Sequence, residues 1–165
     1  MWIVVVVALA AGAGVRPPGG GKDDLGSGKG ADGRVVRVVD GDTIKVRLAA
    51  RTETVRYIGV DTPETVKPGT PVQCYGHAAS AANRRLVGGR EVELRVGAEP
   101  RDRYGRLLAY VYRASDHLFV NADLVRRGYA RTLTIPPNDA LAPRFAVLQR
   151  QASAGGRGLW SACAP

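Results

Sequence analysis

The sequence predicts an α+β fold built on a five-stranded barrel, and two observations carry that prediction. The patterned segments come in the order three strands, a helix, two strands and two further helices, which suits a small barrel with helices packed on it. The chain has 165 residues, of which 45% are hydrophobic. One domain with a buried core and a short appendage is therefore expected, and wholesale disorder is excluded. An irregular α+β sandwich would show similar patterning and stays an alternative.

The beginning of the chain is predicted to lie outside this domain, which is expected over residues 34–165. Residues 2–15 are 14 apolar residues without a charge, and as a helix they rise about 21 Å, less than the roughly 30 Å hydrocarbon core of a membrane. Ala11-Gly12-Ala13 is typical of a signal cleavage site. We expect residues 1–15 to be a signal peptide, with an uncleaved membrane anchor as the alternative, and residues 16–33 to be a flexible Gly-rich linker.

Three strands are expected at the start of the domain. A valine-rich run over residues 35–39 ends at Asp40-Gly41, a pair typical of tight turns. Ile44–Leu48 alternates apolar and charged residues, which predicts a half-buried second strand. Val55–Val60 is the third strand, and Gly59 within it indicates a bend or bulge.

The remaining elements follow from the same periodicities. Residues 75–87 predict an Ala-rich helix that ends at a Gly-Gly pair, and residues 91–96 and 107–112 predict the fourth and fifth strands. Residues 120–127 predict a short helix stopped by glycine. Pro143 fits the first turn of a last helix, where its missing N–H does no harm. The apolar face of that helix is formed by Leu141, Phe145, Leu148 and Ala152.

The charge of the domain restricts its partners. The chain has 24 Lys and Arg against 15 Asp and Glu, a net charge of +9. Residues 1–32 hold three of each sign, so the whole surplus falls in residues 33–165 and predicts a basic surface that attracts nucleic acid or anionic lipid. The chain has only two His and two Cys, too few for most zinc architectures, so any metal is expected to be a hard cation bound by oxygen.

Three short motifs mix acidic and basic residues: Asp40-Gly41-Asp42-Thr43, the run from Arg56 to Glu64, and Arg101-Asp102-Arg103-Tyr104-Gly105-Arg106. In the second motif Pro63 keeps Thr62 out of the helical region, so the strand ends in an extended turn. That turn directs Asp61, the Thr62 carbonyl and Glu64 to one point. Asp42, Asp61 and the carbonyl fit a hard cation that keeps open positions, and Glu64 is suited to deprotonate a water molecule there.

Two arginines on different segments, Arg56 and Arg106, are suited to clamp a phosphate as charge develops on its oxygens. The planar guanidinium matches a phosphate with two parallel hydrogen bonds. Together with the carboxylates they fit a metal-assisted phosphodiesterase. The alternative is an ion-pair network of arginines and carboxylates that only supports a turn.

These motifs resemble the staphylococcal nuclease family, in order, over roughly residues 34–160. The resemblance implies an OB-fold barrel with three helices. It also implies a calcium-dependent nuclease that cuts DNA and RNA, breaks the bond to the 5′ oxygen and leaves a 3′-phosphate. The matching segments are Val39–Thr43, Val55–Glu64, Tyr75–Ser80, Asp102–Tyr112, Val120–Gly128 and Gly158–Trp160.

The resemblance assigns roles in the metal site by position. Asp42 and Asp61 are similar to the calcium-binding aspartates, and Thr62 is similar to the residue that lends its carbonyl. Glu64 matches the glutamate assigned as general base. The resemblance therefore implies the same roles as the chemistry of the residues themselves.

The resemblance also assigns the substrate contacts. Arg56 and Arg106 match the two phosphate-binding arginines. Arg103 and Tyr104 match a Lys and a Tyr that contact the terminal phosphate of the substrate, so the charge is kept at the first position and the ring at the second.

The chain departs from the family where two tyrosines line the nucleotide pocket. A gap-free comparison places Thr134 and Pro136 at those positions. Bases stack on aromatic side chains for about 1–3 kcal/mol each. The departure therefore predicts weaker nucleotide affinity and weaker base preference, with the metal and phosphate chemistry unchanged.

The two cysteines, Cys74 and Cys163, favour a disulfide, because an even count suits a chain that is expected to be exported. Closing a loop of about 90 residues stabilises by at most about 4–5 kcal/mol in the chain-entropy model. Two independent thiols are the alternative.

The leading hypothesis is a secreted, calcium-dependent nuclease that acts as a monomer without a protein partner. Its expected substrates are DNA and RNA, preferably single-stranded or locally open. The alternatives are a non-catalytic nucleic-acid-binding OB-fold module, free or anchored to a membrane, and a basic module at a membrane or cell wall.

Overall fold

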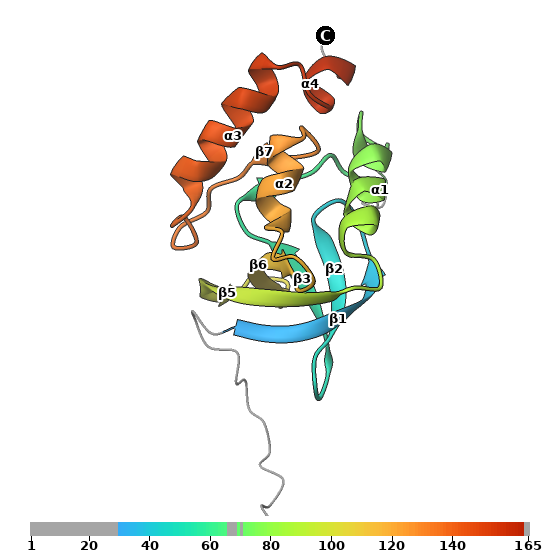
Figure 1. Ribbon diagram of the computed structural model, residues 1–165, viewed down its shortest axis with the longest axis vertical. Coiled ribbons are helices and arrows are strands. Elements are labelled where there is room, and N and C mark those ends of the chain that lie inside the picture. The colour runs from blue at the N-terminus through green and yellow to red at the C-terminus, as the bar shows by residue number, and fades with distance from the viewer. Residues whose placement is uncertain (1–29, 66–68, 70, 164–165) are drawn as a thin grey trace, which may run out of the picture.

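A computed structural model describes residues 30–65, 69 and 71–163 of the protein. Figure 1 shows a closed five-stranded barrel with the helices gathered at one end of it. The predicted α+β barrel is therefore confirmed. The expected signal peptide or anchor, and the expected linker up to residue 29, lie outside the described residues.

The barrel strands are joined in the order β1-β2-β3-β6-β5, and β1 closes the barrel by pairing with both β2 and β5. Neighbouring strands run antiparallel except for β3 and β6, which pair in parallel. A parallel pair needs a long connection, and here the chain between β3 and β6 carries α1 and β5. The strand bounds are β1 Gly30–Val38, β2 Thr43–Arg47, β3 Thr52–Tyr57, β5 Glu91–Arg101 and β6 Leu107–Arg113.

Strand β1 begins at Gly30, earlier than the predicted domain start at residue 34. Residues 30–33, expected in the linker, pair with residues 92–95 of β5. Gly33 suits this place because a Cβ there would lie 2.6 Å from Val46 Cγ1. The predicted domain start at residue 34 was wrong. A Gly-rich composition is typical of linkers, but the hydrogen bonds between strands are made by the backbone, so residues 30–33 can form part of β1 without large side chains.

The helices follow the predicted order. Three of them, α1 (Gly76–Val87), α2 (Val120–Arg126) and α3 (Ala142–Ala154), correspond to the predicted helices. A short fourth helix, α4 (Leu159–Ala162), was not predicted. Pro143 lies in the first turn of α3, as expected. In the described part of the chain no helix is long and apolar enough to cross a membrane.

Buried aliphatic side chains from all five barrel strands fill the core, among them Val35, Ile44, Val55, Leu94 and Leu107. The buried side chain of Asn121 ties α2 to this core: it accepts a hydrogen bond from the Val111 N–H (2.9 Å) and donates one to the Ile58 carbonyl (2.8 Å). A buried amide without partners costs about 1–3 kcal/mol. Asn121 therefore fixes the helical end of the molecule to the strands that carry the polar motifs.

Gly59 divides the predicted strand Val55–Val60 into β3 and a short strand β4 (Val60–Asp61). Its φ is 80°, and a Cβ there would lie 2.3 Å from the ring of Phe145 in α3. Beyond this bend, β4 leaves the barrel and pairs with β7 (Arg131–Thr132) in a separate two-stranded sheet. The bend therefore turns Asp61 away from the barrel wall.

We predict that Gly59→Ala lowers the free energy of unfolding by about 2–5 kcal/mol in urea denaturation. A left-handed backbone costs a residue with a Cβ about 1–2 kcal/mol, and overpacking against Phe145 adds about 1–3 kcal/mol. Gly89→Ala is the matched control, because φ is also positive there (68°) but nothing lies within 4 Å of the added Cβ. Equal losses in the two variants would contradict the role of packing.

Candidate active site

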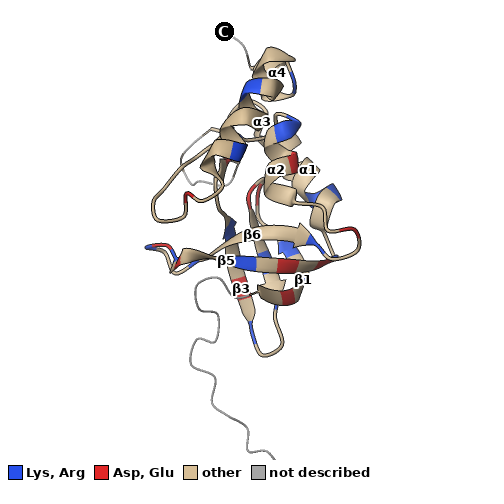
Figure 2. Cartoon of the chain, turned by 60° about the vertical axis from the view of Figure 1, so that its left-hand side comes forward, with Lys and Arg blue, Asp and Glu red and all other residues tan. Residues whose placement is uncertain are grey.

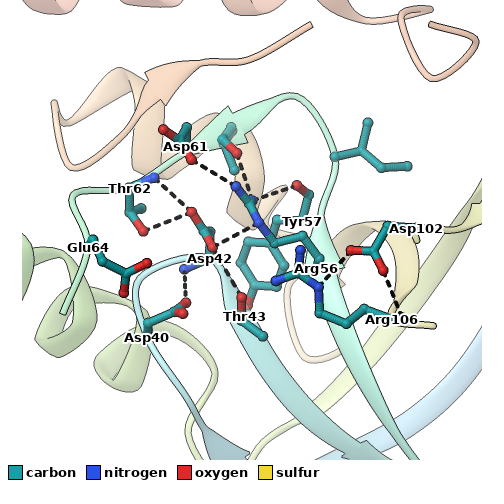
Figure 3. A network of polar contacts seen from close by, with 12 residues as sticks. Asp40, Asp42, Thr43, Arg56, Tyr57, Asp61, Thr62, Glu64, Asp102 and Arg106 are labelled. Carbon is teal, nitrogen blue, oxygen red and sulfur yellow. Dashed lines mark hydrogen bonds and ion pairs between the residues drawn. The ribbon is translucent and has the colours of Figure 1, made fainter. Parts of the chain in front are cut away.

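The three polar motifs meet at one end of the barrel (Figure 3). Asp42 lies in the turn between β1 and β2, Arg56 lies near the end of β3, and Asp61 ends β4. Arg106 directly precedes β6, which pairs with β3. Side chains from distant parts of the sequence therefore converge because the barrel brings these segment ends together.

Asp42 is the most buried acidic residue of the motifs, at 4% exposure. One carboxylate oxygen accepts hydrogen bonds from the Thr62 N–H (2.7 Å) and the Thr62 hydroxyl (2.8 Å). The other accepts a hydrogen bond from the Thr43 hydroxyl and lies 3.3 Å from Arg56 Nε. Thr62, predicted as a carbonyl ligand, thus also fixes Asp42 through its own donors.

Arg56 connects the two predicted metal-binding aspartates. Its Nη2 lies 2.9 Å from Asp61 Oδ1, and its Nε faces Asp42. Its Nη1 donates to the carbonyls of Val60 (2.8 Å) and Tyr57 (3.1 Å), which holds the guanidinium against the β3–β4 bend. The predicted phosphate clamp is therefore itself part of an ion-pair network with the predicted metal ligands.

Negative charge is concentrated around this arginine. Asp40 Oδ1 accepts a hydrogen bond from the Asp42 N–H (3.0 Å), and burial together with the Asp42 charge raises the pKa of Asp40 to about 6. Burial also raises the pKa of Asp61; Arg56 opposes that rise, and Asp42 and Glu64 add to it. Burial is the first cause of both rises, and repulsion between neighbouring carboxylates adds to it; a divalent cation relieves such repulsion.

The donor chemistry of these residues fits a hard divalent cation. Asp42 and Asp61 offer carboxylate oxygens, the ligand class that calcium and magnesium prefer. Among the residues that the structure describes, no three His, Cys, Asp or Glu side chains are already grouped as a metal site. The two aspartates are brought together through Arg56 instead.

Gln73 fixes the backbone of Glu64 through two hydrogen bonds. The Glu64 N–H donates to Gln73 Oε1 (2.8 Å), and the Gln73 N–H donates to the Glu64 carbonyl (2.9 Å). Glu64 Oε1 accepts a hydrogen bond from the Thr65 N–H (2.8 Å). In Figure 3 its carboxylate is turned toward Asp40 and Asp42, which suits a base that acts on a water molecule beside them.

The predicted disulfide is present and stands next to this support. Cys74, the neighbour of Gln73, is bonded to Cys163 at the end of α4, with 5.9 Å between the Cα atoms. The segment that holds the Glu64 backbone is therefore covalently tied to the C-terminal part of the fold.

Asp102 fixes the second predicted phosphate clamp. Asp102 Oδ2 accepts a hydrogen bond from Arg106 Nε (2.7 Å), and Oδ1 accepts from the backbone N–H groups of Tyr104 and Arg106. Burial of Asp102 is outweighed by these hydrogen bonds, which lower its pKa. Figure 3 shows Arg106 reaching toward Arg56 from the side of Asp102.

A cavity of about 520 Å³ opens between the two arginines, and Arg103 and Tyr104 also line it. Tyr104 is 67% exposed, and the guanidinium of Arg103 lies 4.8 Å from the centre of its ring. All four predicted substrate contacts therefore surround one cavity. We call it the first cavity.

The apolar wall of the first cavity differs from the gap-free comparison. Pro136 lines the cavity as expected, but the other contributors are Leu133 and Ile135 rather than Thr134. Residues alternate sides along an extended chain, so the two neighbours of Thr134 face the cavity together. The residues of this segment that line the cavity, Leu133, Ile135 and Pro136, carry no aromatic ring; the tyrosines that line it, Tyr57 and Tyr104, come from other segments.

Several residues of the site were not predicted. Asp40 stands in the Asp-Gly-Asp motif, and its place next to Asp42 was a usable signal. Asp102 precedes Arg106 by four residues, also within a quoted motif. Gln73 had no signal in the sequence, because its partner Glu64 lies across a loop.

The sequence is similar to known nucleases over most of its length. Residues 54–162 match the sequence model described as staphylococcal nuclease homologue. The chain is 45% identical over 126 residues to the thermonuclease of Staphylococcus intermedius, an alignment that covers 76% of this chain and 74% of the relative. It is 42% identical over 128 residues to the thermonuclease of Staphylococcus hyicus, with 78% and 75% covered. It is also 42% identical over 127 residues to the endonuclease YncB of Bacillus subtilis, with 76% and 59% covered.

We predict that replacing Cys74 and Cys163 together by Ser lowers the free energy of unfolding by up to about 4–5 kcal/mol. The Glu64 and Gln73 amides should also exchange hydrogen faster than before, relative to amides of the barrel core. Gln73→Ala is the matched variant, because it keeps the cross-link and removes one hydrogen bond, which is worth about 0.5–1.5 kcal/mol. Unchanged exchange at Glu64 in both variants would contradict this support.

Proposed function

The chain belongs to the staphylococcal nuclease family and is a nuclease, a hydrolase of phosphodiester bonds, and on that premise we propose that it uses calcium to cleave DNA and RNA. The observation that carries the proposal is the convergence of Asp42, Asp61 and Glu64 around Arg56, which lines the first cavity together with Arg106.

Asp42 and Asp61 would hold the calcium ion, with the carbonyl of Thr62. When bound, the ion would supply positive charge next to a phosphate oxygen. Thr62 keeps Asp42 in place through two hydrogen bonds, so this ligand is preorganised. Arg56 already lies beside both aspartates, and its guanidinium is within reach of a phosphate bound there.

Glu64 would take a proton from water as the oxygen attacks phosphorus in line. The new P–O bond forms while the bond to the 5′ oxygen breaks. That oxygen leaves as a 5′-hydroxyl after it gains a proton, and the other product ends in a 3′-phosphate. Arg56 and Arg106 would stabilise the charge that develops on the equatorial oxygens.

The first cavity favours a strand whose bases are accessible. Arg103 and Tyr104 stand exposed at its rim and would contact the neighbouring phosphate and sugar. A base in a duplex is stacked between its neighbours and cannot reach such a wall without unstacking. We therefore propose single-stranded or locally open DNA and RNA as substrates of a monomeric enzyme.

We also propose that the enzyme is exported. The apolar residues 2–15 support a signal peptide. The Cys74–Cys163 disulfide suits an oxidising compartment. Retention by an uncleaved N-terminal anchor is the alternative.

We predict cleavage of denatured DNA with calcium and none with excess chelator. Glu64→Gln should lower kcat by about 10²–10⁴-fold, because the general base is lost, and Arg106→Ala by about 10²–10³-fold. Glu91→Gln and Arg34→Ala are the matched controls, because these residues form an exposed ion pair on the barrel. Mass spectrometry of the products should show 3′-phosphate ends.

Two outcomes of that assay would overturn the proposal. Absence of calcium-dependent cleavage in the wild type would leave a binding module without catalysis. Full activity of Glu64→Gln would remove the assigned base.

We predict that Ile135→Tyr lowers KM for thymidine oligonucleotides by roughly 5- to 150-fold with little change in kcat. Ile135 is 60% exposed in the wall of the first cavity, and a ring there offers a stacking surface worth about 1–3 kcal/mol. Val36→Tyr is the control, because Val36 is also exposed (51%) but lies outside the cavity. Equal effects of both variants would show that the wall does not contact bases.

A further inference from the structure

A second, smaller cavity lies beside Asp61, one of the two proposed metal ligands. Its volume is about 210 Å³, and it is lined by Asp61, Thr62, Pro63, Gln73, Cys74, Arg131, Leu159 and Cys163. The continuous segment 56–63 borders both cavities: residues 56–60 line the first, and residues 61–63 line the second. The segment that carries Arg56 and Asp61 therefore connects the two cavities.

Arg131 is the basic residue of the second cavity. Its backbone pairs with Asp61 through the β4–β7 sheet, which places it beside a predicted metal ligand. It forms no ion pair with any residue in the described ranges, unlike Arg56 and Arg106. Its charge is therefore not offset by a carboxylate contact, although Asp61 shares the cavity.

Trp160 orients the Arg131 guanidinium. The guanidinium carbon lies 4.6 Å from the centre of the indole. The N–H bonds of a guanidinium lie in its plane, so a contact through its face leaves those edges available. An edge of this kind matches the oxygens of a phosphate.

The surrounding surface favours a polyanion. The helices hold five Arg, two in α1, one in α2 and two in α3, against a single acidic residue, Asp123. Asp123 is paired with Arg126 and Arg127. Figure 2 shows basic residues on the helical end of the molecule, and α4 contributes Leu159 to the lining of the second cavity.

We propose that the second cavity is a subsite for the sugar-phosphate unit next to the scissile phosphate, on the side opposite the first cavity, and that Arg131 binds its phosphate. This rests on the proposed function, because a polynucleotide must continue past the site of cleavage in both directions. Pockets for whole small molecules are about 300–1,000 Å³. A cavity below that range suits one unit of a chain, and a phosphate contact carries no base preference.

The test compares substrates that do and do not reach the subsite. A thymidine dinucleotide has only the scissile phosphodiester, whereas an octanucleotide also has neighbouring phosphates. Arg131→Gln should lower kcat/KM for the octanucleotide roughly tenfold and leave the dinucleotide value within twofold. Arg131→Lys should recover most of the loss. Arg47→Gln is the control for charge, since Arg47 ends β2 and lines neither cavity.

A binding measurement separates this proposal from the nuclease assignment. Anisotropy of a labelled octanucleotide, with Glu64→Gln as the background, gives the affinity at several salt concentrations. Arg131→Gln should reduce the slope of log K against log salt by about 0.7, the value for one phosphate contact on a single strand. The salt dependence of binding can be measured even if the wild type does not cleave the oligonucleotide.

Two results would overturn the subsite. Arg131→Gln and Arg47→Gln with the same salt slope would show that Arg131 contacts no phosphate. An equal loss on both substrates would show that Arg131 acts only by supporting the β4–β7 sheet and Asp61.

Discussion

The site depends on the two ion pairs that Arg56 makes, one with Asp42 and one with Asp61. Asp42 comes from the β1–β2 turn and Asp61 from β4, and the two carboxylates repel each other, so a positive charge between them is required to bring them together. Arg56 is only 13% exposed in its side chain, and low exposure strengthens both contacts. The carbonyls of Tyr57 and Val60 complete its environment, so the β3–β4 bend and the charge cluster form one unit.

Preorganisation of this unit comes from several layers of the fold. Because Gly59 has no Cβ, the ring of Phe145 packs directly against the bend. The bend turns β4 out of the barrel, which gives Asp61 its position. The backbone of Glu64 is supported separately, by Gln73 and the neighbouring disulfide. The acids are therefore positioned from two sides, through the barrel core and through the cross-linked C-terminal part. Burial has an electrostatic cost, seen in the raised pKa of Asp40, and the packed surroundings sustain it.

The sequence was sufficient for the barrel, the order of its main elements and the three polar motifs that meet at one end of it, because short motifs and periodicity are local properties. It was insufficient where the deciding contact is distant. The start of β1 at Gly30 depends on pairing with β5, and the support of Glu64 by Gln73 depends on how a loop closes. Counting along the chain placed Thr134 in the cavity, whereas alternation along an extended segment selects its neighbours. The sequence left open whether Arg56 is a phosphate clamp or part of an ion-pair network. In the structure it forms ion pairs with both aspartates, and these do not exclude a contact with phosphate.

The position of the disulfide links the second cavity to the support of Glu64. Cys74 and Cys163 line the second cavity, and Cys74 is bonded to Gln73, which holds Glu64. A shift of α4 would therefore change the cavity wall and the support of Glu64 together. Arg131 is subject to the same constraint, because it pairs with Asp61 on one side and contacts Trp160 of α4 on the other. It follows that the C-terminal helix, although remote in sequence from the three polar motifs, is coupled to the geometry of the proposed reaction centre.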